Sequence, residues 1–166
     1  HIKKMNPDAV ITFIGPCISK KLEALREEVK DFVHYVITFE ELMGMFVAKG
    51  VELSEIEVSK EIQDASTLGR GYAIAGGVAE AVKTTAQLLD PTRDIQVEGA
   101  STLQDCVKLM RMAKAGKKNG YLLEGMACPG GCIAGPGTIA SMNRVKRAVA
   151  DFKNKAEYKT PLDNLH

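Results

Sequence analysis

The sequence has few of the residues that build disulfide frameworks or mixed-ligand metal sites. Its 166 residues include four cysteines (Cys17, Cys106, Cys128 and Cys132) and three histidines, two of them at the chain ends. Four cysteines are too few for a disulfide scaffold in a chain of this length, and a reducing compartment keeps such thiols reduced. We therefore expect a cytoplasmic location, and a zinc site of mixed cysteine and histidine ligands has little to draw on.

The sequence also lacks an excess of charge and long apolar runs. Lys and Arg number 22 against 21 Asp and Glu, which gives a net charge of +1 and no basic surface of the kind that binds nucleic acid. No apolar run approaches the roughly 20 residues of a membrane span, and nothing resembles a signal peptide. The chain opens on His1 without a methionine and soon enters an apolar run, so we expect a piece of a longer protein.

Short apolar runs alternate along the chain with segments of helical periodicity. Strands are expected over residues 9–14, 33–38, 95–98 and 121–123, and helices over 19–32, 39–49, 75–89, 101–114 and 141–155. This alternation predicts the α/β class, with a largely parallel β-sheet flanked by helices. We expect a single lobe over residues 1–157, followed by a polar and loose tail over 158–166.

A loop rich in glycine and proline carries two of the cysteines. Residues 125–137 contain Cys128 and Cys132 together with five glycines and two prolines. Glycine lets the backbone approach a bulky group closely, and proline stiffens the loop. Two thiols held this way are typical ligands for a soft metal centre, either zinc or an iron–sulfur cluster, and a disulfide is the alternative.

A third cysteine follows the first expected strand. Cys17 lies where that strand gives way to a helix, which is where open parallel sheets place ligands and where a thiolate is stabilised. Lys20 and Glu23 follow on the same helix face; Lys20 is either a surface lysine or a donor to an anionic cofactor, and Glu23 either relays protons or pairs with a neighbouring cation. Cys106 lies within an apolar helical stripe and reads as a core residue.

Two segments resemble motifs of the [FeFe]-hydrogenases, the iron-only hydrogenases. The run from Gly15 to Glu23 resembles the family's second cysteine motif, P-C-x-x-K-x-x-E, and the run from Glu124 to Cys132 resembles its third, E-x-M-A-C-x-G-G-C. The segment around Gly76 and Gly77 also looks like one that these enzymes carry between the two motifs. The resemblance runs nearly the whole length of the chain and implies one lobe of a two-lobed catalytic domain.

The resemblance implies a cofactor and a role for each matching residue. The cofactor is the H-cluster, a [4Fe–4S] cubane joined to a di-iron subsite with CO, cyanide and dithiolate ligands, and the reaction is the reversible reduction of protons to H2. By position, Cys17 and Cys128 would bind the cubane and Cys132 would bridge it to the di-iron subsite. Lys20 would donate to a cyanide, Met126 would pack beside the cluster, and Glu23 would belong to the proton path. Gly76 and Gly77 would approach the cofactor, and an anaerobic host is expected.

The family's first cysteine motif is missing from this sequence. We therefore expect a missing N-terminal lobe of the same protein, and an isolated chain that is apo and inactive. An electron-donor protein or upstream iron–sulfur domains would supply electrons. Gly15 stands where efficient members of the family have methionine, and the run from Gly135 to Thr138 replaces their Gly-Gly-Gly-Gln. In both differences the sequence resembles the slow, sensory branch of the family.

Three other readings stay open at the level of sequence. One is an iron–sulfur protein of electron transfer or cluster assembly without hydrogenase activity. The others are a zinc module and a thiol–disulfide module, in both of which Lys20, Glu23 and the Gly76–Gly77 helix start would have no role.

Overall fold

The computed structural model describes residues 1–57 and 63–164, and it divides into two compact units. Unit 1 consists of residues 1–57 together with the segment Gly135–Ile139. Unit 2 consists of the remaining described residues, 63–134 and 140–164. Of the segment near residues 53–75 that has no clear sequence period, residues 58–62 lie outside the described residues.

Unit 1 is built on two short parallel strands. Strand β1 (Thr12–Ile14) pairs with β2 (Tyr35–Ile37), with Phe13 opposite Val36. A short helix α2 (Ser19–Glu23) lies between them in sequence, and helix α3 (Phe39–Ala48) follows β2. The unit also contains α1 (Ile2–Met5) and a 3-10 turn, η1 (Leu53–Glu55).

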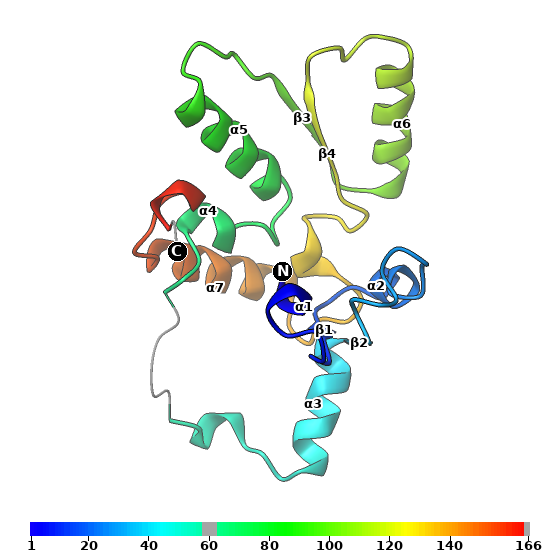
Figure 1. Cartoon of the computed structure of the whole chain (residues 1–166), viewed down its shortest axis with the longest axis vertical. Helices are drawn as coiled ribbons and strands as arrows, with labels where there is room; N and C mark the ends of the chain where they lie inside the picture. Colours follow the sequence, from blue (N-terminus) through cyan, green and yellow to red (C-terminus); the bar gives the residue numbers. More distant parts are fainter. Residues whose placement is uncertain (58–62, 165–166) are drawn as a thin grey trace. The chain divides into compact units, whose positions relative to one another are not determined.

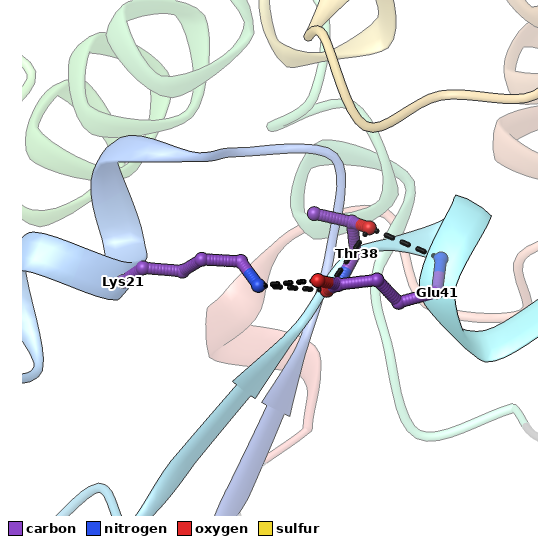
Figure 2. Close-up of polar contacts among 3 residues, drawn as sticks. All are labelled: Lys21, Thr38 and Glu41. Carbon is purple, nitrogen blue, oxygen red and sulfur yellow. Dashed lines mark hydrogen bonds and ion pairs between the residues drawn. The ribbon is translucent and has the colours of Figure 1, made fainter.

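A capping box fixes the start of α3. The Thr38 hydroxyl accepts the backbone N–H of Glu41 at 3.2 Å, and the Glu41 carboxylate accepts the backbone N–H of Thr38 at 2.8 Å. The Lys21 ammonium donates to both oxygens of the same carboxylate, at 2.6 and 2.8 Å (Figure 2). The pKa of Glu41 is lowered from its ordinary value of 4.5 to about 2, first by the hydrogen bond from Lys21 and then by that from the Thr38 backbone, against the opposing effect of burial.

The long helix expected after Cys17 is wrong. Helix α2 ends at Glu23, and residues 24–32 form turns in which four backbone N–H groups bond three residues back, such as Leu25 to Leu22 at 3.2 Å. The apolar side chains that suggested the helix stay in solvent: Leu22 is 72% exposed and Leu25 is 73% exposed. Because a short amphipathic helix gains most of its stability from packing of its apolar face, this segment does not extend α2.

Unit 2 holds a strand–helix–strand crossover. Strand β3 (Val97–Ala100), helix α6 (Leu103–Lys114) and strand β4 (Leu122–Gly125) follow one another, and the two strands pair in parallel. Helix α5 (Gly77–Leu89) lies on one side of this pair and α6 on the other (Figure 1). The unit is completed by α4 (Thr67–Arg70), η2 (Cys132–Ala134), α7 (Met142–Asn154) and η3 (Pro161–Asp163).

The α/β class and the parallel pairing of strands are confirmed. The strands form two separate two-stranded parallel sheets, one in each unit, with helices flanking them. All buried apolar residues lie in unit 2, so the packed core of the described chain is there: Leu68, Ala79, Ala81, Ala100, Leu109, Ile133 and Ala156.

The C-terminal segment is attached more firmly than its polar sequence suggests. The backbone N–H of Thr67 donates to the carbonyl of Tyr158 at 2.8 Å, and that of Leu68 donates to the carbonyl of Lys159 at 3.3 Å. Helix α4 thus supplies backbone donors to residues 158 and 159, and the expectation of a loose tail stays a prediction. The expected boundary between a lobe over 1–157 and a tail over 158–166 stays a prediction.

Candidate functional site

The glycine-rich cysteine loop leaves the carboxyl end of β4. The strand ends at Gly125, and the backbone N–H of Met126 donates to the carbonyl of Ala100 at 2.8 Å, which extends the pairing with β3 by one bond. Cys128 is half-buried, whereas Cys132 is exposed and begins η2. Both thiols therefore lie at the end of a parallel sheet where ligands commonly bind.

The segment before α5 holds this loop by backbone hydrogen bonds. The N–H of Ala75 donates to the carbonyl of Gly130 at 3.0 Å, and the N–H of Ile133 donates to the carbonyl of Ala73 at 3.1 Å. Gly131, whose φ is +100°, lies between these bonds, and a Cβ there would come within 2.4 Å of the Ala75 nitrogen. Only glycine allows the two backbones to approach this closely.

Glu124 ties the same two segments together through a side chain. This residue ends the apolar run of β4, is only 9% exposed, and points its carboxylate at the start of α5. The carboxylate accepts the backbone N–H groups of Val78 at 3.1 Å and Ala79 at 3.0 Å, and also that of Gly76. Since the first N–H groups of a helix have no partner within the helix, the buried charge is stabilised where the helix dipole favours an anion.

The two glycines expected to approach a cofactor have visible roles within the fold. Gly76 is the N-cap of α5, with φ +89°, and its N–H is bound to Glu124. A Cβ on Gly77 would lie 2.0 Å from the carbonyl oxygen of Gly71, so this position accepts no larger residue. Their contact with a cofactor stays a prediction.

The Cys106 thiol contacts the backbone of Met126. The Cys106 Sγ lies 3.6 Å from the Met126 carbonyl oxygen and 3.7 Å from that of Ala100, within reach of a weak thiol hydrogen bond. It also lies 3.2 Å from where a Cβ on Gly125 would stand. Cys106 thus packs against backbone, as expected of a structural cysteine, while the side-chain role of Met126 stays a prediction.

Cys17 belongs to unit 1 and lies in the turn between β1 and α2. It is half-buried, and the helix that follows is only five residues long, with no side-chain bond at its N-cap. A short helix gives a weaker dipole than the long one that the sequence suggested. The chain segment that follows Cys132 is bound beside this turn, because the N–H of Gly137 donates to the carbonyl of Pro16 at 3.0 Å.

Lys20 and Glu23 form an ion pair on α2, with 42% and 43% of their side-chain surfaces exposed. The hydrogen bond from Lys20 lowers the pKa of Glu23, and the charge of Lys20 adds to this effect against a smaller effect of burial. Both residues line a cavity of about 140 Å³ whose other walls are apolar, among them Phe13, Val29 and Val36. Of the alternatives for Glu23, pairing with Lys20 is the one that the structure shows.

The expected ligands are thus divided between the units. Cys128 and Cys132 share one loop of unit 2, and Cys17 lies in unit 1. Among the described residues no three His, Cys, Asp or Glu side chains are grouped as a metal site, and no disulfide is formed there. The joint binding of one cluster by the three cysteines stays a prediction.

Glu124 is the residue that sequence reasoning missed. It is the first residue of the third cysteine motif, and the sequence alone assigns it no role of its own. Two signals could have found it: a carboxylate ending an apolar strand, and a helix that starts at Gly76-Gly77 without a side chain able to cap it. Together they predict that the strand residue caps the helix.

Residues 1–136 match the family model described as the iron only hydrogenase large subunit, C-terminal domain. The chain belongs to this family. The match includes the Cys17 turn and the cysteine loop of this hydrogenase domain, so the recognition made from its motifs is confirmed.

The periplasmic [Fe] hydrogenase large subunit of Nitratidesulfovibrio vulgaris (strain Hildenborough) is 29% identical over 193 residues, which cover 92% of this chain and 46% of that protein. Among solved structures, an [FeFe]-hydrogenase whose inactivation by oxygen begins with modification and degradation of its H cluster 2Fe subcluster matches with a TM-score of 0.74 and 20% identity, over 99% of this chain and 58% of that one. The apo [FeFe]-hydrogenase HydA1 of Chlamydomonas reinhardtii, in a cysteine-to-histidine variant, matches with a TM-score of 0.66 and 19% identity, over 95% and 58%.

The hydrogenase domain therefore spans about half the length of these relatives. At 19–20% identity the structural likeness shows the fold alone. No helix within residues 1–57 and 63–164 is both long and apolar enough to cross a membrane.

Proposed function

We propose that this chain is part of an iron-only hydrogenase that reversibly reduces protons to H2 at a cysteine-bound H-cluster. The observation that carries the proposal is the family match over residues 1–136, which includes Cys17, Cys128 and Cys132. The clamped loop at the end of β4 supports it, because two thiols are held there by backbone geometry rather than by mobile side chains.

The donor set fits an iron–sulfur cofactor. All three candidate ligands are thiols outside any disulfide, and thiolates are the ligands that iron–sulfur clusters take. Cys17 and Cys128 would hold the cubane, and Cys132 would bridge it to the di-iron subsite; when bound, the cofactor supplies the redox chemistry. Met126, Gly76 and Gly77 would form the wall around it.

Lys20 and Glu23 supply the polar chemistry of the chain's own side chains. An ammonium at Lys20 would donate to an anionic ligand of the cofactor, which requires it to release the Glu23 carboxylate that it binds in this structure. Glu23 would then carry a proton on its carboxylate oxygen, since loss of the Lys20 hydrogen bond lets its lowered pKa rise toward the ordinary value. The apolar walls beside the pair would limit the access of water.

The experiment is an infrared spectrum of the full-length protein after loading with the cofactor under anaerobic conditions. We expect bands of CO and cyanide and measurable H2 evolution, and we expect both to be lost in the variants Cys17→Ser, Cys128→Ser and Cys132→Ser. Cys106→Ser is the matched control and should keep the bands, because that thiol packs against backbone in unit 2. Iron–sulfur absorption without CO and cyanide bands would support the electron-transfer or assembly reading, and stoichiometric zinc or disulfide would support a zinc or thiol–disulfide module.

We further propose that the isolated chain is apo and inactive and needs a missing N-terminal lobe. Within the described residues, unit 1 contains no buried apolar side chain, and Phe13, Ile14 and Tyr35 of its two strands are 38%, 44% and 61% exposed. Parallel strands are stable when both faces are covered, so this surface needs further polypeptide. Coexpression of the two halves should restore cluster content, whereas turnover by the isolated chain would contradict the proposal.

The sensory reading rests on Gly15 and on the segment from Gly135 to Thr138. Gly15 is buried, and a Cβ there would lie 2.8 Å from the Phe13 ring, so the local packing suits the small residue. Gly137 donates its N–H to Pro16, the neighbour of Cys17. We propose that these differences from efficient members lower the turnover rate, which the variant Gly15→Met described below tests.

The partners and location are also proposals. The reactants are H2 and protons, and electrons would come from an electron-donor protein or upstream iron–sulfur domains. The relative from N. vulgaris is described as periplasmic, whereas we propose a cytoplasmic location on the ground of the cysteine content. Fractionation of an anaerobically grown host decides between the two compartments.

A further inference from the structure

The side chain of Glu124 joins two parts of unit 2 that are about fifty residues apart in sequence. Its oxygens accept the N–H groups of Gly76, Val78 and Ala79, which are 48, 46 and 45 residues away. The donors are the N-cap Gly76 and two residues of the first turn of α5. Glu124 is the third residue of β4 and directly precedes the cysteine loop.

An ordinary cap would come from the residue that begins the helix. Here that residue is Gly76, which has no side chain, so the acceptor is supplied from a neighbouring strand. The consequence is mechanical: the start of α5 cannot move without β4, and the end of β4 cannot move without α5.

The cysteine loop is bound to the same helix start by its own backbone. Ala75 donates to the carbonyl of Gly130, and Ile133 donates to the carbonyl of Ala73. At Gly131 the backbone of the loop and that of the segment before α5 are so close that a Cβ would not fit between them. The loop is therefore held at three places: by the two backbone hydrogen bonds and by Glu124, which is the one side chain of the three.

We propose that Glu124 is a positioning residue: by clamping β4 onto α5 it holds the loop of Cys128 and Cys132 in one conformation before a cluster binds. A buried carboxylate is costly unless its hydrogen bonds are satisfied, so a fully bonded one fixes its surroundings. The proposal rests on the proposed function only where the cofactor is concerned; the clamp itself is a property of the polypeptide.

The first test is hydrogen exchange of the full-length apo protein with the variant Glu124→Gln. The glutamine side chain has nearly the same size, but its amide nitrogen cannot accept a hydrogen bond from a backbone N–H. The bonds made by one of the two carboxylate oxygens are therefore lost. We expect faster exchange, by roughly tenfold or more, at Val78 and Ala79 and also at Ala75 and Ile133. The control Glu80→Gln removes a carboxylate in the first turn of the same helix that is 56% exposed and pairs with Lys153, and it should leave Ala75 and Ile133 unchanged.

Faster exchange confined to Val78 and Ala79 would overturn the proposal, because Glu124 would then cap the helix without holding the loop. Should Glu124→Gln fail to accumulate, the variant Glu124→Asp keeps the charge, shortens the reach, and is expected to give the same pattern.

The second test is the infrared spectrum of the cofactor-loaded protein. We expect the CO and cyanide bands of Glu124→Gln to shift in frequency, because the loop presents its sulfurs differently. Weaker bands at unchanged frequencies would overturn positioning and leave only a role in stability. Absence of the bands in the unaltered protein would refute the proposed function, while the exchange experiment would still decide whether the clamp exists.

Discussion

Replacement of Arg70 by methionine should loosen helix α4, the element that precedes α5 in unit 2. Arg70, the last residue of α4, is 7% exposed, and its guanidinium donates to the carbonyls of Phe152 at 2.8 Å and Ala65 at 3.1 Å and to the side chain of Gln63 at 2.8 Å. Its carbon Cζ also lies 4.0 Å from the centroid of the Phe152 ring. It thereby joins α4 to α7 in unit 2.

The magnitude follows from what methionine leaves behind. Two backbone carbonyls lose a charged donor, and a hydrogen bond to a charged group contributes about 1.5–3 kcal/mol. The lost contact with the aromatic ring adds about 0.5–2 kcal/mol, and the apolar methionine recovers part of the total. We expect a net destabilisation of about 3 kcal/mol, a large share of the 5–15 kcal/mol that stabilises a typical domain.

The assay is native-state hydrogen exchange of the full-length protein, followed at the amides of α4 and α7. The matched control is Arg147→Met, which removes an exposed arginine of α7 itself and should change these opening energies by less than about 0.5 kcal/mol. Equal effects of the two variants would refute the reasoning, because Arg70 would then add nothing through its buried bonds.

Three further predictions concern the two units separately. Glu41 titrates near pH 2 in the folded chain against an ordinary 4.5, so its bond to Lys21 stabilises unit 1 above about pH 4.5 and this contribution is lost as the pH falls through 2; a carboxyl resonance with its midpoint at 4.5 would contradict this. Gly131→Ala should abolish cluster loading, because a Cβ there meets the neighbouring backbone. The control Gly120→Ala has a similar φ of +80° but no atom within 4 Å of the added Cβ, and it should cost only about 1–2 kcal/mol of stability. Equal cluster loading of the two variants would contradict the role of the close approach at Gly131. Gly15→Met in the full-length enzyme should displace the Phe13 ring and raise the turnover rate, and an unchanged rate would argue against the sensory reading.

Sequence periodicity predicted helices α3 and α5, whose starts are both capped by a carboxylate. Helix α3 was expected over residues 39–49 and is Phe39–Ala48, and the expected start of α5 at the paired glycines is correct. The stripe from Leu22 to Phe32 has the same periodicity, but the helix ends at Glu23. Leu22, Leu25 and Phe32 stay exposed, while Val29 lines the cavity beside Phe13. Periodicity reports the presence of an apolar face and does not report what covers it.

The site was predicted in part for a similar reason. Cysteines in a glycine-rich loop are visible in the sequence, since the residue types alone indicate soft-metal chemistry. The clamp by Glu124 depends on two segments about fifty residues apart, and no local pattern reports that pairing. The division of the strands into two pairs is likewise a tertiary property that alternation of strands and helices does not fix.

The most direct test of the account is a crystal structure of the full-length, cofactor-loaded protein with anomalous data collected at the iron absorption edge. We predict iron within bonding distance of the sulfurs of Cys17, Cys128 and Cys132, and none at Cys106. Iron bound by the loop of unit 2 while Cys17 lies apart from it would contradict the claim that these three cysteines hold one cluster.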